Sequence, residues 1–97
     1  MKILNDENIE CIELQAVAKG RQYKVSFSID GDFHLRFDVI DASTRAHAGY
    51  LTTTIYSGKG SYGYILTPAA DGIMCINKTR GRTNAWTTID NLIIEEV

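Results

Sequence analysis

Two runs of alternating residues flank a short turn within residues 23–40, and they constrain the fold more than any other stretch. Apolar side chains occupy every second position over residues 23–29, and the pattern returns over residues 33–39. A period of two residues predicts a β-strand with one buried face. The segment Asp30-Gly31-Asp32 between the runs has the composition of a turn.

A hairpin is the simplest connection between the two runs, and its loop length decides which side chains face each other. A two-residue turn would set Phe27 opposite His34, on conflicting faces. A three-residue turn sets Phe27 opposite Leu35, so that both apolar faces coincide. We therefore predict an antiparallel hairpin with a three-residue turn, in which Gly31 or Asp32 adopts the left-handed backbone conformation.

The same alternation separates the side chains of these strands into two sets. The apolar set is expected in the core: Val25, Phe27, Leu35 and Phe37. The polar set is expected to point away from it: Lys24, Ser26, Arg36 and Asp38.

The rest of the chain is a series of short strand-like segments separated by turn-forming residues. Further strands are predicted at residues 11–16, 49–56, 62–67, 73–76 and 85–97. Residues 1–10 are expected to form either an arm or an edge strand, and residues 77–84 a basic loop. For residues 7–18, a helix is the alternative to the predicted strand. Many short strands without a convincing helix indicate one all-β domain over residues 1–97, an antiparallel β-sandwich.

Three segments resemble, in the same order, motifs of the galactose-binding-like jelly rolls, in particular carbohydrate-binding modules that bind xylan and glucan. Residues 20–27 (GRQYKVSF) resemble its G-x-x-Y-x-x-S-F segment, residues 66–72 (LTPAADG) its F-T-A-P element, and residues 89–94 (IDNLII) its closing I-D-N-V-x-L strand. The resemblance implies a jelly roll shortened at its N-terminus. It also makes Asp90 a calcium candidate, with a structural role in a turn or bulge as the alternative.

Composition and charge narrow the possible partners. The net charge of −2 is unlike that of a nucleic-acid-binding domain. No apolar run is long enough for a signal peptide or a membrane span, so we expect cytoplasmic synthesis and no membrane partner. The two cysteines, Cys11 and Cys75, match no metal motif and are expected to be reduced; we expect no cofactor.

Catalysis is not expected from this sequence. The only two histidines are His34, on a predicted strand surface, and His47, in a predicted loop. Neither has a nucleophile or an acid at a spacing that indicates a catalytic set. We therefore predict that the protein is not an enzyme.

The aromatic residues are the best candidates for ligand binding. Sugar rings stack on flat apolar side chains that are flanked by polar groups. A stacking platform could include Trp86, Tyr50, Tyr56, Tyr62 and Tyr64, with Arg36, Arg80 and Arg82 as hydrogen-bond donors. The alternative is that Tyr62, Tyr64 and Trp86 are core or rim residues of a small sandwich.

Two functions from different classes remain open. The first is a structural accessory protein that docks on other protein subunits, such as a capsid or tail decoration component, because domains similar to these jelly rolls also occur in bacteriophage virions. Its expected binding elements are the edge strands, the N-terminal arm and the loops at residues 41–49 and 77–84. The second is a carbohydrate-binding module that recognises an oligosaccharide by aromatic stacking.

Overall fold

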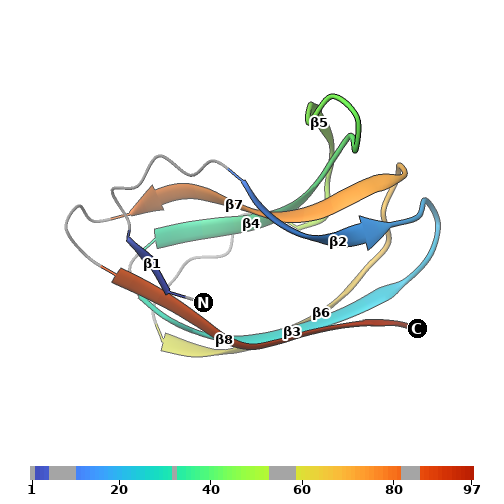
Figure 1. The fold of residues 1–97 in the computed structure, drawn as a ribbon. Helices are drawn as coiled ribbons and strands as arrows, with labels where there is room; N and C mark the ends of the chain where they lie inside the picture. Colours follow the sequence, from blue (N-terminus) through green and yellow to red (C-terminus); the bar gives the residue numbers. More distant parts are fainter. Residues whose placement is uncertain (1, 5–10, 32, 53–58, 82–85) are drawn as a thin grey trace.

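The computed structural model shows two antiparallel four-stranded sheets that face each other (Figure 1). It describes residues 2–4, 11–31, 33–52, 59–81 and 86–97. The first sheet, called the β3 sheet, has the order β1 (Lys2–Leu4), β8 (Trp86–Glu96), β3 (Tyr23–Asp30), β6 (Lys59–Leu66). The second, called the β4 sheet, has the order β2 (Ile12–Val17), β7 (Gly72–Gly81), β4 (Phe33–Ile40), β5 (His47–Tyr50). The predicted all-β antiparallel sandwich is confirmed.

The predicted hairpin is wrong, because β3 and β4 lie in opposite sheets. β3 pairs with β6 and β8, whereas β4 pairs with β5 and β7. Of the consecutive strands described, only β4 and β5 are neighbours in one sheet. The turn after Asp30 therefore carries the chain across the sandwich. At Gly31 it passes so close to Thr87 of β8 that a Cβ atom would overlap that side chain.

The alternation nevertheless identified the buried faces correctly. Val25, Phe27, Leu35 and Phe37 are each at most 3% exposed, as predicted. The rings of Phe27 and Phe37 approach from opposite sheets, with centroids 5.5 Å apart. A strand buries every second side chain whether its partner lies beside it in the same sheet or across the core in the other sheet. The alternating pattern therefore fitted both arrangements.

The polar set divides in the structure. Lys24 is exposed, and Ser26 and Arg36 are half-buried on the outer faces of their sheets. Asp38 also lies on an outer face, since its neighbours Phe37 and Val39 point into the core, yet it is only 1% exposed. A carboxylate buried on the outside of a sheet needs partners, and these are described below.

Several predicted boundaries also change. β7 continues to Gly81, so the predicted loop is wrong over residues 77–81; these residues are held by pairing with β4. β5 begins at His47 and ends at Tyr50, while residues 53–56 of the predicted strand lie outside the described residues. Residues 12–17 form a strand and not a helix, with a register shift between Glu13 and Gln15. Residues 2–4 form an edge strand.

Candidate functional site

The outer face of the β3 sheet gathers exposed apolar side chains. Ile65 lies opposite Lys24 and Ile93 opposite Ser26, and both therefore point away from the core. Ile65 is 63% exposed and Ile93 is 51% exposed. Trp86, also 51% exposed, points the same way, because the next residue of β8 is fully buried. We call this surface the groove face.

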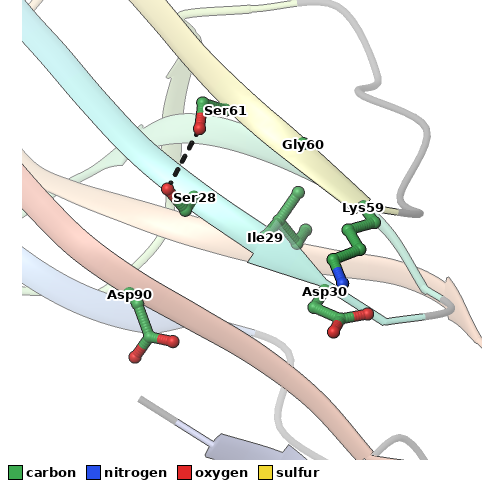
Figure 2. Close-up of a pocket in the computed structure, with 7 residues that line it drawn as sticks. All are labelled: Ser28, Ile29, Asp30, Lys59, Gly60, Ser61 and Asp90. Atoms are coloured by element: carbon green, nitrogen blue, oxygen red, sulfur yellow. Dashed lines mark hydrogen bonds between the residues drawn. The ribbon is translucent and has the colours of Figure 1, made fainter.

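A shallow groove of about 360 Å³ lies on this face, where β3 ends and β6 begins (Figure 2). It is lined by Ser28, Ile29, Asp30, Lys59, Gly60, Ser61 and Asp90. Short side chains make its floor, because Ser28 of β3 and Ser61 of β6 lie opposite each other, with their hydroxyl oxygens 3.2 Å apart. Its polar lining and low walls suit a contact with a polar or mixed surface more than an enclosed apolar ligand.

Charged side chains from three strands line this groove. Asp30 and Lys59 are a cross-strand pair of opposite charge at one end (Figure 2). Asp90 is exposed on β8, beside the left-handed Asn91. In the part of the chain that the structure describes, no three His, Cys, Asp or Glu side chains gather into a group that could hold a metal ion. The calcium candidate Asp90 therefore has no described set of co-ligands.

Trp86 is held from one side at the start of β8. The short strand β1 pairs with β8 and sets Leu4 opposite Trp86. The Lys2 ammonium lies 4.9 Å from the centre of the indole ring, within the range of a cation–π contact. Lys2 thus contacts one side of the ring, while about half of the surface of Trp86 stays exposed on the groove face.

A second polar cluster lies on the outer face of the β4 sheet, around Asp38. Arg36 donates two hydrogen bonds to its carboxylate, from Nε to Oδ1 at 2.8 Å and from a terminal nitrogen to Oδ2 at 3.0 Å. Asn77 Nδ2 donates a third at 3.2 Å, and His47 Nε2 lies 3.6 Å from Oδ2. The hydrogen bonds to Asp38 raise the pKa of the Arg36 guanidinium. We call these four residues the Asp38 cluster.

Tyr50 covers the Asp38 cluster from outside. Its ring centre is 4.6 Å from the Arg36 guanidinium carbon and 4.4 Å from the centre of the His47 ring. The side chain is still 68% exposed. A ring that is fixed on one side and open on the other is a preorganised stacking surface.

The two cysteines lie beside this cluster and are free. Cys75 pairs with Asp38 across β4 and β7, and it interacts with Cys11, the residue that directly precedes the neighbouring strand β2. Burial raises the pKa of both thiols. They are therefore protonated at neutral pH and suited to packing, not to nucleophilic attack.

The aromatic residues proposed as one platform are dispersed in the structure. Trp86 and Tyr50 lie on the outer faces of different sheets. Tyr62 and Tyr64 pack against Phe27 with ring centres 5.5 and 6.4 Å away, as half-buried residues at the edge of the core.

The four remaining candidates are placed as follows. Tyr56 and Arg82 lie outside the described residues. Arg80 is placed by its backbone, opposite His34. Arg36 stands under Tyr50, as described above.

The sequence prediction missed the Asp38 cluster as a unit. Arg36 and Asp38 were assigned to one strand face, which was the available signal that they could form an ion pair. Asn77 could not be added without the strand order, since β7 reaches β4 from a distant part of the chain, and His47 was predicted to lie in a loop and not on a strand paired with β4.

Comparisons with known proteins found no relative. No model of a protein family matches the chain, and neither the curated proteins nor the solved structures contain a match. Among the described residues, no helix is long and apolar enough to cross a membrane.

Proposed function

We propose that this chain is a non-catalytic docking domain that binds other protein subunits through its groove face. The observation that carries this proposal is the placement of Ile65, Trp86 and Ile93 on one outer sheet face. Exposed apolar side chains grouped on one surface are typical of protein interaction sites. Ser26 and Gly63 lie in the same cross-strand row as Ile93, and their small size allows a partner to approach the backbone closely there.

The assembly we propose is a virion, with this chain made in the cytoplasm and added as a capsid or tail decoration. This part depends on the resemblance of residues 20–27, 66–72 and 89–94 to galactose-binding-like jelly rolls, which also occur in bacteriophage virion proteins. The two-sheet sandwich is compatible with that family. A docking role needs only a stable scaffold with an exposed face, and no catalytic group.

Particle incorporation tests this proposal. A tagged chain should co-purify with the particle, and Ile93→Lys should reduce its incorporation because a charge enters an apolar contact. Gln15→Lys, at an exposed position of the opposite sheet, is the matched control and should have no effect. Both variants should keep the melting temperature of the wild type. Equal incorporation of both variants would exclude the groove face as the docking surface.

A carbohydrate-binding module is the second candidate, and Tyr50 is the observation that favours it. Its exposed ring has Arg36 and His47 beneath it, and the nearby polar groups could bind sugar hydroxyls. A glycan array tests this alternative with the wild type, Tyr50→Ala and Trp86→Ala. Binding to a defined oligosaccharide that is lost in Tyr50→Ala alone would assign sugar binding to this face. Loss only in Trp86→Ala would move the sugar to the groove face.

A further inference from the structure

The four edges of the two sheets are protected to very different degrees. An exposed edge strand offers unpaired backbone groups to another chain, and proteins usually shorten or distort such strands. β1 has three residues and β5 has four, and the register of β2 is interrupted between Glu13 and Gln15. β6 has eight residues, all paired with β3 without a register shift. Within the described strands it has no partner on its other side.

The sequence of β6 adds no protection either. Its only charged residue is Lys59, at the very start, and it contains no proline. Ile65 is 63% exposed near its end. Tyr62 and Tyr64 are only half-buried, and their rings lie nearly parallel, 6.5 Å apart, along this edge of the core. Another strand beside β6 would therefore cover backbone groups and aromatic surface together.

We propose that β6 pairs antiparallel with β6 of a second copy of this chain. A strand can always pair with its own copy about a two-fold axis perpendicular to the sheet, and such an interface is self-complementary. The pairing would join two four-stranded β3 sheets into one continuous sheet. This interface uses the backbone edge of the sheet, and of the three apolar residues proposed for docking on the groove face it involves only Ile65.

The side chains of β6 fit a register centred on Tyr62. Residues with numbers that add to 124 then face each other, so Tyr62 meets Tyr62 of the copy and Tyr64 meets Gly60. An aromatic side chain opposite an edge glycine fills the space that the glycine leaves. On the outer face, Ser61 meets Gly63, and Ile65 meets the aliphatic stem of Lys59. Each large side chain thus has a small, aromatic or aliphatic partner.

Such a dimer would present its two groove faces on the same side. A two-fold axis perpendicular to a sheet leaves each outer face on its original side. Two identical docking surfaces would then bind a repetitive assembly together, and the second contact would gain from the high effective concentration. The second copy therefore gives the proposed docking domain a means to bind repeated subunits more tightly than one copy can.

Sedimentation velocity from micromolar to millimolar concentration tests the dimer. The wild type should show a concentration-dependent monomer–dimer equilibrium. Ile65→Lys should weaken it by about tenfold, because symmetry places like charges beside Lys59 twice in the interface. Ile93→Lys is the matched control. It makes the same substitution on the same outer face, but on β8, which is two strands away from the β6 edge, and it should leave the dimer equilibrium unchanged. A monomer throughout, or equal weakening by both variants, would overturn the proposal.

Hydrogen exchange identifies the interface itself. In a β6–β6 dimer, the amides of β6 that point away from β3 should become protected as the concentration rises. A dimer without this protection would place the interface elsewhere and overturn the proposal. Protection that appears only when a different protein is added would assign the edge to a foreign strand, and would also overturn it.

Discussion

Gly72 stands at the start of β7, where the chain leaves no room for a side chain. A Cβ atom there would overlap the carbonyl oxygen of Ile40 and lie 2.8 Å from Cγ1 of Val39. Both neighbours belong to β4, which is held between β5 and β7. The carbonyl group cannot move away without disturbing that pairing. We therefore expect Gly72→Ala to destabilise the fold.

The expected size follows from two opposing effects. Overpacking costs about 1–3 kcal/mol, and a clash with backbone belongs at the upper end. Replacing a strand glycine by alanine returns roughly 0.5–1 kcal/mol of chain entropy. The net loss is about 2 kcal/mol, out of a total stability of roughly 5–15 kcal/mol for a domain of this size. The melting temperature should fall by about 10 °C.

Gly49→Ala is the matched control for this experiment. Gly49 pairs with Val39 from the other side of β4, and a Cβ atom there would meet no atom within 4 Å. The control should therefore be neutral or gain up to about 1 kcal/mol. Urea unfolding followed by circular dichroism measures both variants. Equal midpoints for Gly72→Ala and Gly49→Ala would refute the proposed close contact between β7 and β4.

Three further predictions concern the core and two titrating sites. Phe27→Ala should cost about 3–5 kcal/mol, and an unchanged urea midpoint would contradict the burial of this ring. The backbone N–H groups of Thr44 and Ser43 donate hydrogen bonds to the Asp41 carboxylate, and these bonds lower the pKa of Asp41. Wild type should therefore be more stable than Asp41→Ala at neutral pH, and urea midpoints should converge as the pH falls through that lowered pKa; a constant difference would contradict this. Burial raises the pKa of Cys11 and Cys75, so iodoacetamide at neutral pH should label the folded protein more slowly than the urea-unfolded chain. Equal labelling rates would contradict it.

The sequence predicted the strands and buried faces of this fold better than their pairing. The alternation around Phe27 and Phe37 shows which side chains are buried, but not whether the partner strand lies beside them or across the core. A short turn containing Gly31 is compatible with both connections. The choice depends on distant strands, since β6 and β8 occupy both sides of β3 and leave no place there for β4.

The candidate sites were harder to predict for a related reason. Outer-face residues such as Asp38 were predicted only to point away from the core, and the alternation along β4 does not show that Tyr50 and His47 of β5 cover that face. The exposed face with Ile65 and Ile93 likewise depends on β6 and β8 lying on either side of β3. These groupings come from strand order, which local patterns do not contain.

Site-specific photo-cross-linking tests the docking proposal most directly. A benzophenone side chain would replace Ile93 on the groove face or, as the control, the exposed Gln15 on the opposite sheet. Particles carrying each variant would be irradiated, and the cross-linked products identified by mass spectrometry. We predict a cross-link to another protein subunit from position 93 and none from position 15. No cross-link from position 93, or equal yields from both positions, would contradict docking through the groove face.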